Sequence, residues 1–262
     1  MTARASSPPG LRAGVRTAAA LLAVLLVGWG VLVLASLLLR TEDAETQEFG
    51  GVTALVVDAG FESVEVVGST GAASVTVART GSWSLIAPSR TAAVHDGRLS
   101  VSSDCHLSAG RGCGGRLRVV VPADLPVTVS SGDGDLVLTG LTGRVTAATT
   151  DGTVHARGLT GALSVTTGDG GLTGVALGSS QVTVSSGDGA VELAFDDPPE
   201  AVTVHSGDGA VTVAVPDDDG PYRVGARADD AAATVSVPTD RRSDRHIDVS
   251  TGDGAIRVVS AS

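Results

Sequence analysis

Short runs of alternating apolar and polar residues, joined in pairs by a Gly-Asp-Gly turn, recur through the second half of this chain. In one copy, Val182 and Val184 lead into the turn at Asp188, and Val191 and Leu193 follow it. Alternation with a period of two is typical of a β-strand with one buried face. Gly adopts positive φ without steric cost, and Asp hydrogen-bonds to nearby backbone, so both favour a turn. Each copy is therefore predicted to be a strand, a tight turn and a second strand.

The copies follow one another at a nearly constant spacing. Successive turn aspartates are 18, 18, 19, 20, 22 and 23 residues apart. Self-similarity at such a period predicts stacked repeats, none of which can bury its apolar face alone. The copy at Asp230 is degenerate, with Ala231 where the others have Gly. The other structural turns are expected at Asp133, Asp151, Asp169, Asp188, Asp208 and Asp253.

Two arrangements of these strands compete. Asp followed by Gly is also a hairpin signal, so an antiparallel meander is the alternative. Strict repetition favours parallel stacking, because like residues then form columns. The predicted columns are Val127, Val145, Leu163, Val182, Val202 and Ile247; Leu136, Val154, Leu172, Val191, Val211 and Ile256; and the hydroxyl ladder Ser131, Thr149, Thr167, Ser186, Ser206 and Thr251. We predict an all-β fold, a parallel β-solenoid (β-helix), with its Gly-Asp-Gly repeats over 122–262 and irregular N-terminal β coils over 51–121.

The N-terminal segment is uncharged and long. Residues 17–39 carry no charge, and about 1.5 Å of rise per residue would take such a helix across a hydrocarbon core of about 30 Å. The alternative is a cleaved signal peptide, which has a shorter apolar stretch. We expect a single transmembrane helix over 17–39, a cytoplasmic basic tail over 1–16, an acidic linker over 40–50, and an extracytoplasmic C-terminal domain held at the cell membrane.

The charge balance restricts the partners. After Arg40 the chain has all of its 29 acidic residues but only 14 of its 18 basic ones. This argues against nucleic acid and against anionic lipid surfaces. It leaves an envelope or surface protein, or a glycan, although aromatic residues are only 2% of the chain, which disfavours a carbohydrate groove. A homo-oligomer through the C-terminal coil is a further expectation, because the last repeat ends near Val258 with strand edges exposed.

The two cysteines lie close together in a Gly-rich stretch. Outside the cytoplasm, a disulfide between Cys105 and Cys113 is the expected state. A metal site that uses His106 is the alternative, but a second pair of Cys or His at ligand spacing is missing.

Carboxylates are the candidate metal ligands. The turn aspartates would stack about 5 Å apart, which favours either turn chemistry or a line of Ca²⁺ ions. A second group at the opposite corner could form an oxygen-rich Ca²⁺ site or a solvated acidic face. Its members are Asp196, Asp197, Glu200, Asp217, Asp218 and Asp219. We expect no cofactor, with Ca²⁺ as the alternative.

Catalytic motifs are missing from the sequence. It contains no H-E-x-x-H, no G-x-S-x-G and no P-loop. Paired carboxylates are frequent, so a parallel β-helix polysaccharide lyase or glycosidase is the alternative, but such sites also need a substrate groove, and the predicted coils are short and poor in aromatic residues. The chain is therefore expected not to be an enzyme.

The repeats also resemble a known family. Val127-Thr-Val-Ser-Ser-Gly-Asp-Gly-Asp-Leu-Val-Leu, Val202-Thr-Val-His-Ser-Gly-Asp-Gly-Ala-Val-Thr-Val and the preceding Arg118-Val-Val-Val-Pro are similar to the bacterial putative-adhesin family, a domain of unknown function in cell-envelope proteins. The resemblance covers about Val52 to Val259. It implies a membrane-anchored β-solenoid with Gly-Asp-Gly repeats and offers no catalytic residues, and some members are linked to envelope-stress signalling.

Three functions follow as hypotheses. The first is a non-enzymatic cell-surface adhesion or interaction module. The second is an envelope-stress sensor or a self-assembling envelope subunit. The third is a Ca²⁺-stabilised binding module.

Overall fold

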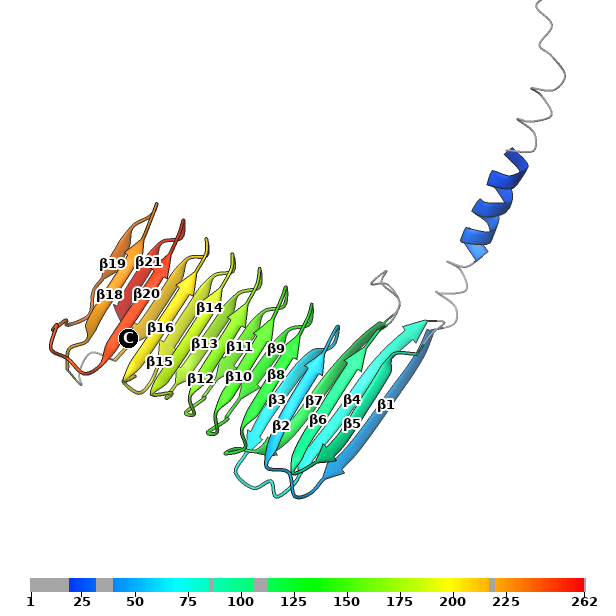
Figure 1. Cartoon of the computed structure of the whole chain (residues 1–262), viewed down its shortest axis with the longest axis horizontal. Coiled ribbons are helices and arrows are strands. Elements are labelled where there is room, and N and C mark those ends of the chain that lie inside the picture. The colour runs from blue at the N-terminus through cyan, green and yellow to red at the C-terminus, as the bar shows by residue number, and fades with distance from the viewer. Residues whose placement is uncertain (1–18, 32–39, 85–86, 106–112, 217–219, 262) are drawn as a thin grey trace, which may run out of the picture.

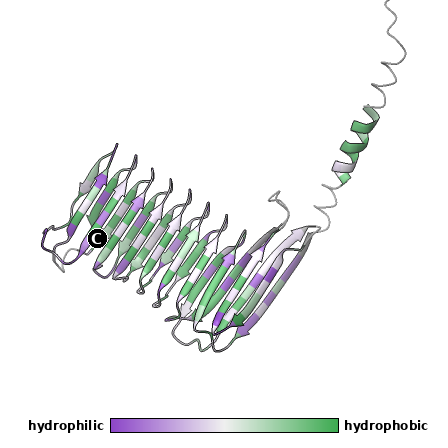
Figure 2. Ribbon diagram, viewed as in Figure 1, coloured by the Kyte–Doolittle hydropathy of each residue, from purple (hydrophilic) through white to green (hydrophobic). Residues whose placement is uncertain are grey.

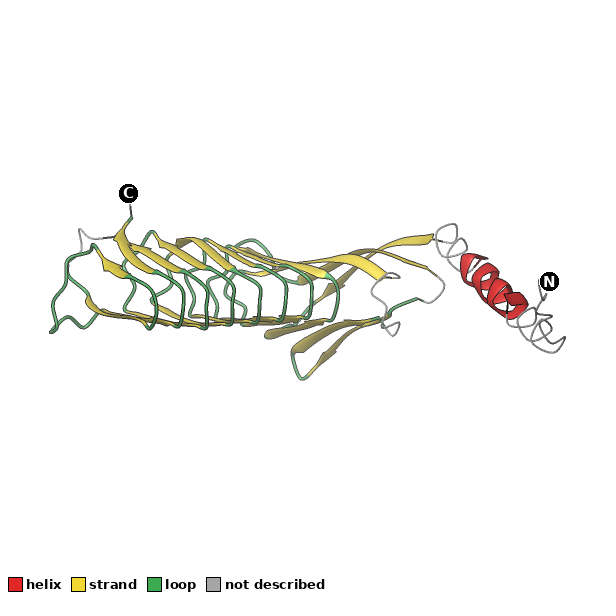
Figure 3. Cartoon of the chain, turned by 90° about the horizontal axis from the view of Figure 1, so that it is seen from above, coloured by secondary structure: helices red, strands yellow, loops and turns green. Residues whose placement is uncertain are grey.

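The computed structural model describes residues 19–31, 40–84, 87–105, 113–216 and 220–261 of the 262-residue chain. These residues form one short helix over 19–31 and two large β-sheets that lie face to face (Figure 1, Figure 3). The eleven-stranded sheet has, in spatial order, β1 (Arg40–Phe49), β4 (Val75–Ser84), β7 (Cys113–Pro122), β3 (Ser63–Ser69), β9 (Leu136–Thr139), β11 (Val154–Arg157), β13 (Leu172–Leu177), β15 (Val191–Phe195), β17 (Val211–Val215), β21 (Ile256–Ser260) and β19 (Ala233–Val235). The ten-stranded sheet has β18 (Arg223–Ala228), β20 (His246–Thr251), β16 (Ala201–Ser206), β14 (Gln181–Ser186), β12 (Leu163–Thr167), β10 (Val145–Thr149), β8 (Val127–Ser131), β2 (Ala54–Ala59), β6 (Arg98–Asp104) and β5 (Ser89–His95).

The repeats stack in parallel and in register. Each Gly-Asp-Gly turn leads the chain from the ten-stranded sheet to the eleven-stranded sheet. The first predicted column is confirmed, from Val127 paired with Val145 to Val202 paired with Ile247. The second is confirmed from Leu136 to Ile256. The antiparallel meander is therefore excluded for this part of the chain.

The core is a single thin layer between the sheets. Inward-facing Val, Leu and Ala side chains from both sheets form one buried cluster, and Figure 2 shows apolar residues recurring on successive strands. The hydroxyl ladder is also inward-facing, and its register is confirmed from Ser131 to Ser206. Two ladder hydroxyls accept the N–H of the second turn glycine, Ser131 Oγ from Gly134 at 3.1 Å and Thr149 Oγ1 from Gly152 at 3.2 Å. These hydroxyls therefore satisfy backbone groups that the turn buries.

The turn glycines are needed for a different reason from the one expected. Among the described residues, the glycines with positive φ lie outside these turns, at positions such as Gly140 and Gly158. A Cβ added to Gly170 would instead lie 1.9 Å from the carbonyl oxygen of Gly152, its equivalent in the neighbouring repeat. The same clash recurs at Gly189, 2.1 Å from Gly170 O. Close approach of successive backbones, not a left-handed conformation, therefore dictates Gly here.

The C-terminal end is not built in sequence order. β20 and β21 pair with β16 and β17 on one side, and with β18 and β19 on the other. The last repeat in sequence is thus inserted between two earlier ones. The degenerate repeat around Asp230, not the one that ends near Val258, is the outermost (Figure 1). The expectation that the final repeat exposes its edges is therefore wrong.

The N-terminal part is more regular than expected. β2 and β3 lie in register with the first Gly-Asp-Gly repeat, with Leu55 opposite Val127 and Val64 opposite Leu136. Beyond them, β1, β4 and β5 pair antiparallel with their neighbours. Residues 40–50 were expected to be an acidic linker, but residues 40–49 form the edge strand β1, because their backbone groups pair along the whole of β4.

Two parts of the predicted fold class are wrong. The sheets are mostly but not wholly parallel, and the structure does not show them closed into a solenoid. The predicted transmembrane helix over 17–39 is also corrected. The described helix covers 19–31 and is about 20 Å long. No helix in the described residues is long and apolar enough to span a bilayer; residues 17–18 and 32–39 lie outside them.

Candidate functional site

The outer face of the ten-stranded sheet carries a regular array of hydroxyl groups, which we call the hydroxyl face. It lies on β8, β10, β12, β14 and β16, where outward positions are in register from strand to strand. Eight of its ten positions are Ser or Thr. The ten are Thr128, Ser130, Thr146, Ala148, Ser164, Thr166, Thr183, Ser185, Thr203 and His205. Since neighbouring strands lie about 4.8 Å apart, the face repeats a neutral donor-acceptor pattern at that interval.

The outer face of the other sheet has no such uniformity. One outward column there runs through Val137, His155, Thr173, Glu192 and Thr212, in register across β9 to β17. It mixes apolar, charged and hydroxyl side chains. Of the two outer faces of the repeats, only the hydroxyl face is formed mainly by one kind of side chain. The outer face of the eleven-stranded sheet can therefore serve as a control surface in binding experiments.

The turn aspartates lie in solvent, as side chains at a tight turn should. All six of the predicted set are exposed, and they form a row along one corner of the repeats. At about 5 Å spacing, screening by water keeps the repulsion between neighbours near 1 kcal/mol. This arrangement is compatible with turn chemistry alone.

The acidic corner is only partly described. Asp196, Asp197 and Glu200 are exposed in the turn between β15 and β16. Asp217, Asp218 and Asp219 lie outside the described residues. In the part of the chain that is described, no three His, Cys, Asp or Glu side chains come together as a metal site would need.

One cysteine can be placed. Cys105 directly follows the end of β6 and is disulfide-bonded, and no described cysteine is free. The side chain of Cys113 and the alternative ligand His106 lie outside the described residues.

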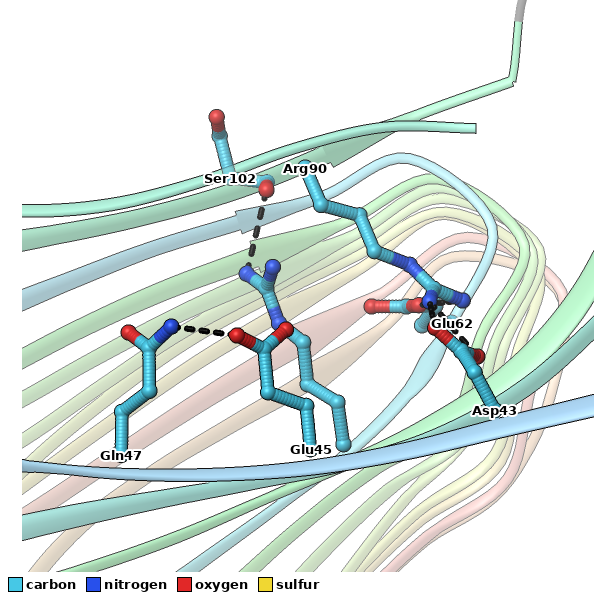
Figure 4. A network of polar contacts seen from close by, with 7 residues as sticks. Asp43, Glu45, Gln47, Glu62, Arg90 and Ser102 are labelled. Atoms are coloured by element: carbon cyan, nitrogen blue, oxygen red, sulfur yellow. Dashed lines mark hydrogen bonds and ion pairs between the residues drawn. The ribbon is translucent and has the colours of Figure 1, made fainter. Parts of the chain in front are cut away.

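A buried ionic cluster closes the N-terminal end of the core, and sequence reasoning missed it. Glu62 is completely buried, and its carboxylate lies 3.3 Å from the guanidinium of Arg90, whose side chain is 11% exposed. Arg90 Nη1 also donates to both carboxylate oxygens of Asp43, at 3.0 and 2.9 Å. Figure 4 shows Arg90 reaching between the two acids. Three chain segments, from β1, β5 and the β2–β3 turn, are thereby joined.

Two glycines make room for this cluster. Gly81 and Gly115 are opposite each other on β4 and β7. A Cβ on Gly81 would lie 2.1 Å from Arg90 Nη2, and one on Gly115 would lie 2.8 Å from Glu62 Oε1. The ion pair therefore occupies the space that inward side chains fill elsewhere in the sheet. Gly inside two paired strands was the signal from which the cluster could have been found.

The cluster is incompletely hydrogen-bonded. In the described part of the chain, neither carboxylate oxygen of Glu62 accepts a hydrogen bond. Next to it, Arg79 Nη2 donates to the carbonyls of Thr91 and Ser102, each at 3.1 Å. Burial, partly opposed by the charge of Glu62, lowers the pKa of Arg79. A cavity of about 120 Å³ lies between Arg79 and Arg90. This geometry supports a structural role for the cluster rather than a catalytic one. A buried ion pair stabilises the fold only weakly, but removing one of its partners is costly.

Comparison with known proteins gives a weak likeness. No family model and no curated protein matches the chain. A putative cell adhesion protein from Clostridium sporogenes is 12% identical over 84% of this chain and 100% of that chain, with a TM-score of 0.40. A putative adhesin from Parabacteroides merdae is 12% identical over 85% and 97%, with a TM-score of 0.37. Likenesses this low carry no argument about function, and membership of the family that the repeats resemble stays a prediction.

Proposed function

We propose that this protein is a non-enzymatic, extracytoplasmic adhesion module that binds an envelope or surface component through its hydroxyl face. The in-register columns of Ser and Thr on the ten-stranded sheet carry the proposal. Each hydroxyl both donates and accepts hydrogen bonds, so a flat partner with repeating polar groups can bond to several strands at once. A single such bond contributes only about 1 kcal/mol, and a regular array adds many of them.

Two further observations support this location and class. Disulfides persist in oxidising compartments, and Cys105 is disulfide-bonded. The five strands of the hydroxyl face carry no formally charged residue at their outward positions. A neutral face on an acidic chain favours hydrogen bonding to a neutral polymer over electrostatic capture of a basic partner.

Removing two hydroxyls from this face should weaken binding. The change Thr128→Val with Thr183→Val keeps side-chain shape and strand preference. We expect it to weaken retention of the full chain on isolated bacterial cell-wall and membrane fractions roughly tenfold or more, since two bonds of about 1 kcal/mol are lost. Co-sedimentation in a non-ionic detergent measures this, with protease-treated and glycan-hydrolase-treated fractions to show whether the partner is protein or glycan.

The matched control lies on the other sheet. Thr173→Val with Thr212→Val removes two hydroxyls from the mixed outer face and should leave retention unchanged. Equal losses in both pairs, or no retention of the unaltered protein by any fraction, would show that the hydroxyl face is not the binding surface.

A further inference from the structure

The C-terminal end of the core is open. The outermost strands there are β18 in one sheet and β19 in the other. The inward residues of β18, which are Val224, Ala226 and Ala228, are only half-buried although they pack against the core, and Val235 of β19 is 40% exposed. A cleft of about 640 Å³ opens between the two strands beside them. Equivalent positions in interior repeats are fully buried, so this end lacks a neighbour.

The opposite end is unlike it. There the inward positions of the edge strands β1 and β5 mix the apolar Phe49, Ala92 and Val94 with the charged Asp43, Glu45 and Arg90. Inward-pointing charges discourage further strand pairing. The apolar C-terminal end does not match an end that carries these charges, so head-to-tail stacking of copies is disfavoured. The mate for the apolar end must itself be apolar, and a second copy presents that surface at its own C-terminal end.

We propose that two copies of this chain associate through their C-terminal ends, with β18 of one copy paired antiparallel to β18 of the other. A two-fold axis normal to the sheets reverses strand direction while keeping each sheet continuous with its counterpart. Such an isologous contact closes as a dimer and does not propagate into a fibre. It buries the half-exposed apolar residues, which supplies the driving force.

The outward edge of β18 is occupied only at its start, where Tyr222 donates its N–H to Pro238 O and accepts from Asp240 N. From Val224 to Ala228, β18 pairs with no described strand other than β20.

The N–H groups of Arg223 and Asp229 already donate towards the β20 side, to the carbonyls of Arg245 and Thr251. Backbone groups of a strand alternate between its two edges, so those of Val224, Ala226 and Ala228 face outward. When the two β18 strands pair about Ala226, each outward backbone N–H or C=O can bond to one of the second copy. Side chains that face the core in one copy then lie opposite side chains that face the core in the other.

Charge selects this register over its neighbours. A centre at Ala226 places Arg223 opposite Asp229 of the second copy, twice per dimer. A centre at Gly225 would place Arg223 opposite Arg227, and a centre at Arg227 would place that residue opposite itself. Opposite charges stabilise directly facing pairs, and like charges destabilise them. Arg227 Nε already lies 3.3 Å from Asp229 Oδ1 within one copy. In the dimer, Asp229 would thus lie between Arg227 of its own copy and Arg223 of the second copy.

Sedimentation velocity of the full chain in a density-matched non-ionic detergent tests the proposal. The unaltered protein should dimerise reversibly. Arg223→Glu and Asp229→Arg should each raise the Kd of the dimer about tenfold or more, because each places like charges opposite each other twice. The double change should restore the Kd to within about threefold. Arg257→Glu, on the exposed face of β21 away from the edge, is the control and should have no effect.

A second measurement does not depend on charge. Ala226→Cys should give a disulfide-linked dimer on mild oxidation, because facing residues of a hydrogen-bonded antiparallel pair have Cα atoms about 5.5 Å apart. A strictly monomeric protein, a dimer unaffected by both single charge changes, or a double change that restores nothing would each overturn the proposal.

Discussion

Replacing Arg90 with methionine should lower the free energy of unfolding by about 3–5 kcal/mol, since it leaves Glu62 buried without its ion-pair partner. Glu62 is 0% exposed, and neither of its carboxylate oxygens accepts a hydrogen bond within the described residues. Urea denaturation followed by fluorescence measures the loss. Trp83 is a local reporter, because Arg90 lies 5.5 Å from the centre of its ring, and a Trp29→Phe background removes the other indole.

A double change separates a lost ion pair from lost packing. Replacing Glu62 and Arg90 together with methionine removes both members of the ion pair and keeps the volume nearly constant, while Arg79 keeps its hydrogen bonds to the carbonyls of Thr91 and Ser102. The double variant should regain most of the stability that Arg90→Met loses, because an apolar pair in place of a buried ion pair is often neutral or stabilising.

The control is an exposed ion pair between β7 and β3 of the eleven-stranded sheet. Arg118 Nη1 bonds to both carboxylate oxygens of Glu65 at 2.8 and 2.9 Å, with the arginine side chain 51% exposed. Arg118→Met should cost no more than about 1 kcal/mol. If Arg90→Met costs as little as Arg118→Met, or if the double variant is the least stable of all, the cluster does not work as a buried pair.

Replacing Gly170 with alanine should lower the free energy of unfolding by about 1–3 kcal/mol, although only one methyl group is added. That methyl carbon would lie 1.9 Å from Gly152 O and 2.7 Å from the Gly152 carbonyl carbon. Both are backbone atoms of the adjacent repeat, so relief requires the two repeats to separate at this corner. Urea denaturation followed by circular dichroism measures the effect.

Gly71→Ala provides the comparison. No atom lies within 4 Å of an added Cβ there, and Gly71 is not among the glycines with positive φ. It should change stability by less than about 1 kcal/mol, in the stabilising direction, because Ala restricts the unfolded chain. Equal effects of the two changes would mean that backbone freedom, not close stacking, explains the glycines.

The repeat itself made the stacking predictable. Residues such as Val145 and Leu163 recur with the turn, and only parallel stacking brings them together, as the structure confirms. The role of the turn glycines was not accessible in the same way. A positive φ and a close neighbour both exclude Cβ, and the sequence pattern is identical for the two causes.

Spatial order at the C-terminal end was beyond the sequence. The strand around Ile247 fits equally well against Val202 and against Val224, and it pairs with both. Alternation specifies which face of a strand is buried but not which strand is its neighbour. The degenerate repeat was visible in Ala231, yet nothing local indicated that it had been displaced to the edge.

The ionic cluster was missed because its members belong to different segments. β2 and β3 align with the first Gly-Asp-Gly repeat, and this places Glu62 where that repeat has Gly134. A departure from the motif therefore marks the site. Its counter-charge, Arg90, comes from an antiparallel strand outside the repeat, and no spacing rule connects the two. The hydroxyl face, by contrast, follows directly from the outward positions of the repeats once their register is known.

The register of the repeats supports every other conclusion, and a pair of engineered cysteines tests it most directly. Thr146 and Ser164 are outward and face each other on β10 and β12. We expect Thr146→Cys with Ser164→Cys to form a disulfide readily under mild oxidation, because adjacent strands place Cα atoms about 4.8 Å apart. Thr146→Cys with His155→Cys should not, since His155 lies on β11 in the other sheet. Cross-linking of the second pair without the first, read by mass spectrometry of the full chain, would contradict the account.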